Sequence, residues 1–380
     1  MAPEMRRLVN HTWVSGTSVG VHGVACKFPA SWEPDEWIGT LMLGPDFATE
    51  VPLSRWDHGQ FYDADIKNVA RGKTYCCHAA FVDGLELFDC QLFDIMPLQA
   101  KRVDPNQRFL LEVGYDALYR MGETRESLAD ANCAVFVGHG CSEWKYVASD
   151  RSAASTRMSY CFGLTGVSVT VDTGPSSSLT AVHNAVGSVR GIGNAKSDMA
   201  LASGVSLLLS HVPWLELSAA RWLSRSKGRC ATFDQMADGF IKGDGCAAVA
   251  LKIMQDITPD GVLHAPKDSS STLVGLLAGT RACATGRAAN LTAPSAPVTQ
   301  QVLVEAATDA GIFASDVNAT QVHGSATLLR DAVEVHAALR AHRMTDTLRN
   351  PLGLNASKTA LGETWDAGGM ASLLMTLLSG

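Results

Sequence analysis

The chain has 380 residues, of which 46% are hydrophobic and 18% are charged, a composition typical of a soluble globular protein with a large buried core. Its net charge of -7, without any basic stripe, argues against nucleic acid or an anionic membrane surface as a partner. The uncharged stretches 199–215 and 367–380 contain polar residues or are too short to cross a bilayer, so we expect no membrane span.

The ten cysteines are spread through apolar segments of a long chain, which favours reduced thiols over a disulfide framework. We therefore expect a reducing compartment, either the cytoplasm or the interior of an organelle. Cys161 is expected to be an inert core cysteine. The sequence contains neither a CxxC pair nor an HExxH motif, so no metal site and no other cofactor are predicted.

The predicted elements alternate between strands and helices. Residues 1–17 carry little pattern and are expected to form an extension. Asp104 and Pro105 are typical of a helix start, because aspartate caps the first turn and proline fits into it. In chain order, hydrophobic pattern and turn residues predict strands at 19–24, 133–137, 167–171, 199–209, 245–251, 273–278 and around Val322, and helices at 34–43, 105–121, after residue 175, and at 298–310, 332–341 and 370–378.

This alternation predicts a mostly parallel sheet with helices on its faces. Residues 258–272, which include two prolines and four consecutive polar residues, are the best candidate for a linker. In such sheets ligands bind at the carboxyl ends of strands, where turns lead into helix N-termini that can hold an oxyanion or activate a thiol. The turn at residues 172–178 is the first candidate for such a site.

The segment VDTGPSSSLTAVH around this turn resembles the nucleophile turn of the β-ketoacyl synthases, especially those of modular polyketide synthases. The resemblance covers residues 18–380. Further blocks that match the family in order and spacing are VHGVACKFP, EVPLSRWD, GKTY, LFDIMPLQAKRVDPNQRFLLEVGYDAL, RCATFDQMADGFIKGDGCAAVALK, LTAPSAP, HGSATLLRDAVEV and SKTALGETWDAGG.

The resemblance implies a thiolase-like, layered αβαβα fold made of two related halves, at residues 18–260 and 270–380. Family members continue beyond the segment that ends this chain, so the second half is expected to lack the usual final strands. Relatives pair through central strands across a two-fold axis, which implies a homodimer or a heterodimer with an active ketosynthase.

In the family, a cysteine thiolate accepts an acyl group from a carrier protein, and two histidines then help a malonyl thioester to decarboxylate. The resemblance places Pro175 at the cysteine position, His323 at the first histidine, Lys358 at a lysine, and Glu363 at the second histidine. Proline carries no nucleophile, although it fits the first turn of a helix.

Glu363 is expected to put a negative charge where the family has a hydrogen-bond donor. Two like charges about 4 Å apart repel by roughly 4 kcal/mol at an effective dielectric constant near 20, which opposes a malonyl carboxylate or an enolate. A structural ion pair between Lys358 and Glu363 would offset part of this charge.

These replacements predict a pseudoenzyme of polyketide or fatty-acid assembly, unable to catalyse decarboxylative condensation. It would act as a partner subunit, a scaffold or an acyl binder, with acyl carrier protein or an acyl thioester as its ligand. Two alternatives stay open: an acyltransferase or thioester hydrolase led by His323 and Lys358, and a structural component of a larger assembly. The three serines at 176–178 are weaker nucleophile candidates, because active family members carry them too.

Overall fold

The computed structural model describes residues 18–144, 151–192, 196–226, 228–256, 263–264, 273–290, 292–344 and 350–379. The strands are β1 (Val19–Lys27), β2 (Thr49–Glu50), β3 (His78–Ala80), β4 (Cys133–Gly138), β5 (Ser168–Val171), β6 (Met199–Ser206), β7 (Lys242–Gly243), β8 (Gly245–Ile253), β9 (Gln255–Asp256), β10 (Leu263–His264), β11 (Gly275–Leu277), β12 (Ala319–Gln321) and β13 (Gly353–Asn355).

The α-helices are α2 (Pro34–Met42), α3 (Pro97–Ala100), α4 (Pro105–Arg120), α5 (Arg125–Leu128), α6 (Arg151–Phe162), α7 (Ser177–Arg190), α8 (Val212–Ala219), α9 (Ala296–Asp309), α10 (Leu328–His342), α11 (Lys358–Leu361) and α12 (Gly368–Ser379). The 3₁₀ helices are η1 (His58–Gln60), η2 (Ile66–Arg71), η3 (Ala314–Asp316) and η4 (Trp365–Ala367). The predicted extension at 1–17 and the predicted linker at 258–272, apart from β10, lie outside the described residues.

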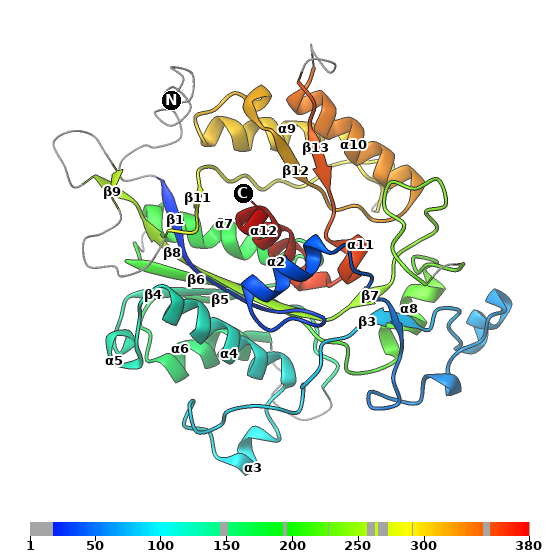
Figure 1. Ribbon diagram of the computed structural model, residues 1–380, viewed down its shortest axis with the longest axis horizontal. Helices are drawn as coiled ribbons and strands as arrows, with labels where there is room; N and C mark the ends of the chain where they lie inside the picture. The colour runs from blue at the N-terminus through cyan, green and yellow to red at the C-terminus, as the bar shows by residue number, and fades with distance from the viewer. Residues whose placement is uncertain are drawn as a thin grey trace.

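A six-stranded sheet in the order β11-β1-β8-β6-β4-β5 forms the centre of the molecule (Figure 1). β4 runs parallel to β5 and β6, whereas β8 is antiparallel to both β6 and β1, and β11 is antiparallel to β1. The prediction of a mostly parallel sheet is therefore wrong. A parallel neighbour needs a crossover over a face of the sheet. α8 follows β6 but packs at the end of the sheet near β3, so β8 returns beside β6 in the opposite direction (Figure 1).

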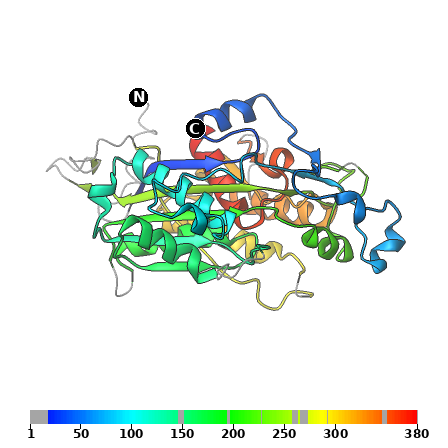
Figure 2. The same ribbon diagram turned by 90° about the horizontal axis from the view of Figure 1, so that it is seen from below.

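Helices and strands form successive layers around this sheet (Figures 1 and 2). α4 and α6 cover one face, where Leu111 and Met158 join the buried core. α7 and α12 cover the other face through Val182 and Leu374. The parallel pair β12–β13 lies beyond α12, with α9 and α10 outermost. This order of layers confirms the expected thiolase-like α/β fold. Within the described residues, the sheet of the second half consists of the two strands β12 and β13.

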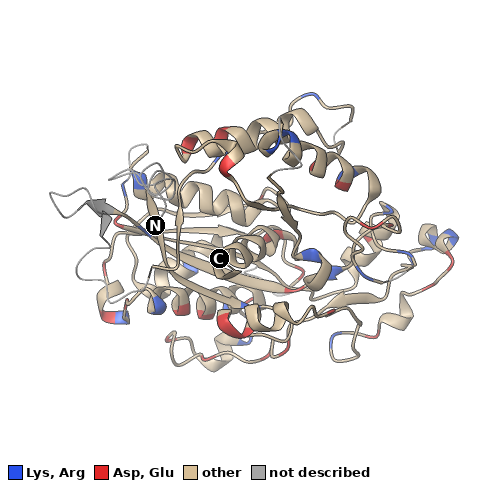
Figure 3. Ribbon diagram, turned by 45° about the horizontal axis from the view of Figure 1, so that its top comes forward, with Lys and Arg blue, Asp and Glu red and all other residues tan. Residues whose placement is uncertain are grey.

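Charge follows the layers. Figure 3 marks residues of both charge signs along the ribbon of the outer helix α10, whereas the central strands and α12 are almost free of charged residues. β4 is buried along its whole length, as expected for a strand covered on both faces. Among the described residues, no helix is both long enough and apolar enough to span a bilayer.

Hydrogen bonds from side chains explain where two elements begin and end. α4 begins as predicted, with the Asp104 carboxylate accepting from the backbone N–H of Asn106 at 2.9 Å. β6 ends at Ser206, earlier than the predicted 199–209, because the next backbone N–H groups donate to side chains instead of a neighbouring strand. The N–H of Leu207 donates to Asn106, that of Leu208 to Asp244, and that of Leu209 to Glu143.

Glycines let α7 start close to the strand ends. A Cβ atom added at Gly138, the last residue of β4, would lie 2.5 Å from the backbone nitrogen of Ser178. A Cβ atom at Gly204 in β6 would lie 2.5 Å from the Cβ of Ser178, and one at Gly369 would lie 3.1 Å from its Oγ. The first turn of α7 is therefore seated against β4, β6 and α12.

Candidate active site

The turn before α7 carries Pro175 at its tip. Gly174 has a φ of 63°, and its carbonyl accepts from the backbone N–H of Ser177 at 2.9 Å. Ser176 is the N-cap of α7 and Ser177 its first residue, so Pro175 directly precedes the cap. The helix predicted after residue 175 therefore begins two residues beyond Pro175. Pro175 is half-buried and offers neither a nucleophile nor an N–H donor.

The neighbouring serines are engaged in holding the turn together. Ser176 donates to the carbonyl of Thr173 at 2.9 Å, and Ser177 donates to Asp366 at 3.0 Å. Ser178 accepts from the backbone N–H of Met370 at 3.0 Å. Ser177 and Ser178 are fully buried. These contacts indicate a structural role for the three hydroxyl groups.

Asp366 links the turn to the loop that carries Glu363. Its carboxylate accepts from Ser177 and, at 2.8 Å, from the backbone N–H of Gly140 just after β4. Burial raises the pKa of Asp366, and the hydrogen bonds from Gly140 and Ser177 oppose that rise only in part. Sequence reasoning missed this residue, although it belongs to the SKTALGETWDAGG block that pointed to Lys358 and Glu363.

His323, Lys358 and Glu363 come together from two chain segments. His323 follows β12, Lys358 begins α11, and Glu363 lies just after the same helix. The Lys358 ammonium forms an ion pair with the Glu363 carboxylate and lies 2.8 Å from Nε2 and 2.9 Å from Nδ1 of His323. The side chains of Lys358 and Glu363 are 6% and 2% exposed, whereas that of His323 is 46% exposed.

The charges in this cluster shift two pKa values downward. For Glu363, burial acts to raise the pKa, but the positive charge of Lys358 and the nearby His323 outweigh it. Loss of hydration and the positive charge of Lys358 lower the pKa of His323, whereas the negative charge of Glu363 acts to raise it. At neutral pH the cluster therefore holds a carboxylate beside an uncharged imidazole. Glu363 is an acceptor on both oxygens, since Oε1 accepts from the N–H of Trp365 at 3.0 Å.

The loop of His323 is fixed by a carboxylate from α10. The backbone N–H groups of His323 and Gly324 both donate to Glu334, the second at 2.8 Å. A small cavity of about 240 Å³ opens beside His323 and is also lined by Arg330 and Glu334. His323 is therefore held in place on its backbone side and accessible on its ring side.

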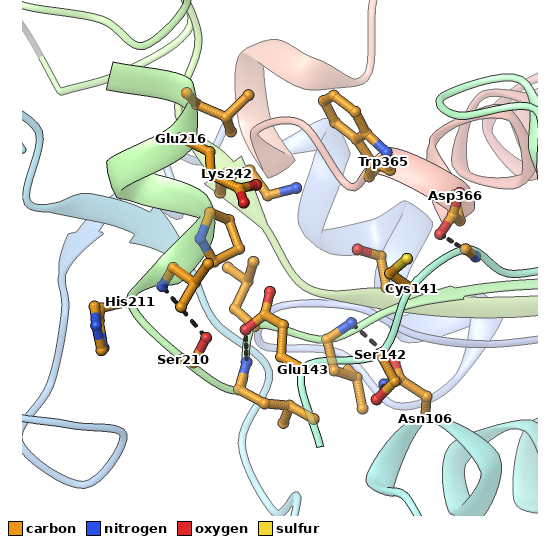
Figure 4. A pocket seen from close by; sticks show the side chains of 18 of the residues that line it. Asn106, Cys141, Ser142, Glu143, Ser210, His211, Glu216, Lys242, Trp365 and Asp366 are labelled. Carbon is orange, nitrogen blue, oxygen red and sulfur yellow. Dashed lines mark hydrogen bonds between the residues drawn. The ribbon is translucent and has the colours of Figure 1, made fainter. Parts of the chain in front are cut away.

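A larger cavity of about 760 Å³ lies at the ends of β4 and β6 (Figure 4). Asp172 and Asp366 line it where it meets the turn before α7, and Leu208 and Leu217 belong to its apolar wall. The residues that line it do not include Pro175, His323, Lys358 or Glu363. The cavity thus reaches the base of the turn but not the cluster around Glu363.

Lys242 and Trp365 connect the cavity to that cluster. The Lys242 ammonium lies 4.6 Å from the ring centroid of Trp365, and both residues line the cavity (Figure 4). Lys242 pairs through its backbone with Glu363, and the Gly243 N–H donates to the Glu363 carbonyl at 3.0 Å. Burial lowers the pKa of Lys242, and the nearby carboxylates of Glu363 and Glu143 act in the opposite direction.

The cavity also contains a thiol that sequence reasoning did not single out. Cys141 is exposed and accepts a hydrogen bond from Arg151, which forms an ion pair with Asp172 at 2.9 Å. Its position just beyond the carboxyl end of β4 was the available signal, since such strand ends carry ligand sites in α/β folds. Cys161, by contrast, is half-buried in α6, and burial raises its pKa, as expected for an unreactive cysteine.

Two family models match the chain. The N-terminal domain of β-ketoacyl synthases matches residues 17–256, and the C-terminal domain matches residues 274–379. The chain belongs to the β-ketoacyl synthase family, of the polyketide synthase type.

Known polyketide synthases and their ketosynthase domains are similar along nearly the whole chain. The phthioceranic/hydroxyphthioceranic acid synthase of Mycobacterium tuberculosis (strain ATCC 25618 / H37Rv) is 34% identical over 378 residues, which cover 96% of this chain and 17% of that protein. A mycocerosic acid synthase-like polyketide synthase of Mycolicibacterium smegmatis is 32% identical, with 95% of this chain and 17% of that protein covered. The chain therefore spans about a fifth or less of these relatives.

Solved ketosynthase structures share the fold. An oxazolomycin ketosynthase domain of Streptomyces albus JA3453 superposes with a TM-score of 0.87 at 28% identity, covering 96% of this chain and 62% of that one. The ketosynthase from module 6 of the bacillaene synthase of Bacillus subtilis 168 gives a TM-score of 0.84 at 26% identity, covering 95% and 60%.

Proposed function

We propose that this chain is a ketosynthase-like domain that does not catalyse decarboxylative condensation and instead binds an acyl thioester as a partner or scaffold in polyketide assembly. The observation that carries the proposal is the buried ion pair between Lys358 and Glu363. It fixes a carboxylate, an acceptor-only group, at the position where the family resemblance places a histidine donor.

This chain lacks a group that each of the two steps of the condensation reaction requires. The first step needs a nucleophile that takes up the acyl chain, and Pro175 offers none. The second step needs donors aimed at the developing enolate oxygen, since such preorganised donors supply much of the stabilisation in reactions of this kind. Glu363 offers no donor, and an unpaired carboxylate about 4 Å away would repel that oxygen by roughly 4 kcal/mol at an effective dielectric constant near 20, of which the ion pair with Lys358 offsets a part.

The large cavity supports acyl binding. Its volume of about 760 Å³ lies in the range of small-molecule sites. Apolar side chains such as Leu208 and Leu217 line it together with charged ones such as Glu143. Carrier-bound acyl groups are the expected ligands. As further parts of the proposal, the chain divides into halves at 18–260 and 270–380 and associates with a second copy or with an active ketosynthase.

Acyl transfer or thioester hydrolysis is a second candidate, because Cys141 places a thiol in the cavity next to Arg151 and Asp172. In this reaction the sulfur of Cys141 would bond to the thioester carbonyl carbon, the bond from that carbon to the carrier sulfur would break, and the proton from Cys141 would pass to the leaving thiolate. A purely structural role in a larger assembly is the remaining alternative.

Incubation with an octanoyl-pantetheine thioester distinguishes these functions. We expect saturable binding by calorimetry, no turnover, and no acyl adduct on the peptide that contains residues 172–178. An adduct on that peptide contradicts the proposal. An adduct that disappears in Cys141→Ser, or hydrolysis that disappears in His323→Ala, supports the second candidate. The absence of any binding leaves the structural role.

A further inference from the structure

Three side chains with metal-binding atoms meet on the small sheet β2-β3-β7, and none of the three lines the large cavity. Glu50 in β2 and His78 in β3 are direct partners in the antiparallel register, and Cys77 precedes His78. One ligand atom from each of the three residues lies within 4.8 Å of the others. No spacing in the sequence pointed to this group, because Glu50 reaches the other two residues only through strand pairing.

The separation of the sulfur and nitrogen atoms suits a tetrahedral zinc ion. The Sγ of Cys77 lies 3.5 Å from the Nδ1 of His78. Zinc–sulfur and zinc–nitrogen bonds of about 2.3 and 2.05 Å at a tetrahedral angle place these two atoms about 3.6 Å apart. The thiol and the imidazole therefore already stand at the separation that a shared zinc ion would impose. Glu50 is exposed, so rotation of its side chain can bring the carboxylate to the same ion.

The surrounding backbone holds two of the donors in place. The carbonyl of Cys77 accepts from the backbone N–H of Val51 at 2.9 Å, which ties it to the segment after β2. A Cβ atom added at Gly228 would lie 2.3 Å from the Nδ1 of His78. The same added atom would lie 2.6 and 2.7 Å from two further ring atoms, so the imidazole packs directly against this glycine, and any larger residue would displace it. Cys77 and His78 are half-buried, so their side chains are less free to move than that of Glu50.

We propose that Glu50, Cys77 and His78 form a binding site for a zinc-type divalent cation, with water in the fourth position. A thiolate, an imidazole and a carboxylate are the donors that zinc takes, whereas magnesium and calcium require oxygen ligands. Because Ala79 of β3 pairs with Lys242 of β7, a bound ion would tie β2 to the sheet that carries Lys242. The site is independent of the acyl-binding function proposed above.

Titration of the full-length, tag-free, reduced and chelator-treated protein with ZnCl₂ tests this site. Calorimetry should give one tight equivalent, and Co²⁺ should give the visible absorption of a thiolate-bound tetrahedral ion. Loss of a ligand should weaken binding by more than the roughly 10- to 100-fold that typical second-shell changes cost. We expect this loss in Cys77→Ser and His78→Ala and a smaller one in Glu50→Gln. Cys283→Ser, which removes another exposed thiol, should bind as the unmodified chain does.

Circular dichroism of the metal-free variants shows whether they are folded, and zinc should raise the melting temperature of the unmodified chain but not of Cys77→Ser. The proposal is overturned if the unmodified chain takes up no zinc equivalent, or if Cys77→Ser and His78→Ala bind it with unchanged affinity.

Discussion

Lys358 and Glu363 form an ion pair that is almost completely buried, with the imidazole of His323 against the same ammonium group. The family resemblance places at His323 and Glu363 the two histidines that help a malonyl thioester to decarboxylate. Here the ammonium and the carboxylate satisfy each other, and His323 keeps a neutral ring at neutral pH because its pKa is lowered. The cluster is therefore arranged to be stable in the absence of a substrate.

Removing only one partner of the ion pair should lower the stability of the fold strongly. We expect Lys358→Met and Glu363→Leu each to lower the free energy of unfolding by about 3–5 kcal/mol, because each leaves one buried charge without its partner. The double variant should lose much less than the sum of the two. Guanidinium unfolding of the four proteins measures these differences, and additive losses would show that the two charges do not stabilise each other.

The pKa of His323 should respond to Lys358. Removing the ammonium in Lys358→Met takes away a positive charge that lowers this pKa, so the pKa should rise. NMR titration of the imidazole Hε1 resonance measures it. His342, whose pKa is lowered mainly by burial elsewhere, serves as the control and should not change.

The lowered pKa of His323 makes the stability of the fold depend on pH. Because the pKa of His323 is lower in the folded chain than its ordinary value of 6.5, the unfolded chain binds the proton first as the pH falls. The contribution of His323 to stability is therefore complete above pH 6.5 and is lost as the pH falls toward the folded pKa. Urea unfolding between pH 7.5 and 5.5 should show a shallower decline for His323→Asn than for the unmodified chain. Equal slopes would exclude this contribution.

The close packing of α7 against β4 should be disrupted by any side chain at Gly138. A methyl group there would lie 2.5 Å from the backbone nitrogen of Ser178, so Gly138→Ala should destabilise the fold by about 1–3 kcal/mol. Gly187, in the same helix, has nothing within 4 Å of an added Cβ atom. Gly187→Ala should therefore stabilise the chain by roughly 0.5–1 kcal/mol. Thermal unfolding of both variants measures the contrast, and equal effects would contradict the packing described for α7.

Restoring the thiol should restore only part of the chemistry. In Pro175→Cys, a sulfur at the tip of α7 gains the positive end of a helix, which favours thiolates. We expect acylation of the peptide containing residue 175 by an octanoyl thioester, detected by mass spectrometry, but no condensation product while Glu363 remains. Condensation by the single variant would show that the carboxylate does not block the second half of the reaction.

Local signals in the sequence were sufficient for several elements. Asp104 caps α4 as its residue type predicts, and the ordered family blocks led to the layered fold and to His323, Lys358 and Glu363. These features depend on neighbouring residues or on a long series of matched segments. Strand direction depends on where a connecting segment packs, which is why the antiparallel course of β8 was not predicted.

Contacts between distant segments could not be read from the sequence. Asp366 joins α7 to the end of β4 through Ser177 and Gly140, two residues far from it in the chain. The cavity next to it forms only when the residues after β6 bind side chains instead of extending the strand. Cys141 follows the predicted strand at 133–137, which was a signal for a ligand site, but only the fold shows that its thiol faces a ligand-sized space.

Release of carbon dioxide from a carboxyl-labelled malonyl thioester, in the presence of an octanoyl thioester, tests the absence of condensation chemistry most directly. We predict no release of carbon dioxide above background for the unmodified chain. The double variant Pro175→Cys with Glu363→His should release carbon dioxide and form a β-ketoacyl product. Sustained release by the unmodified chain, accompanied by a β-ketoacyl product, would contradict it.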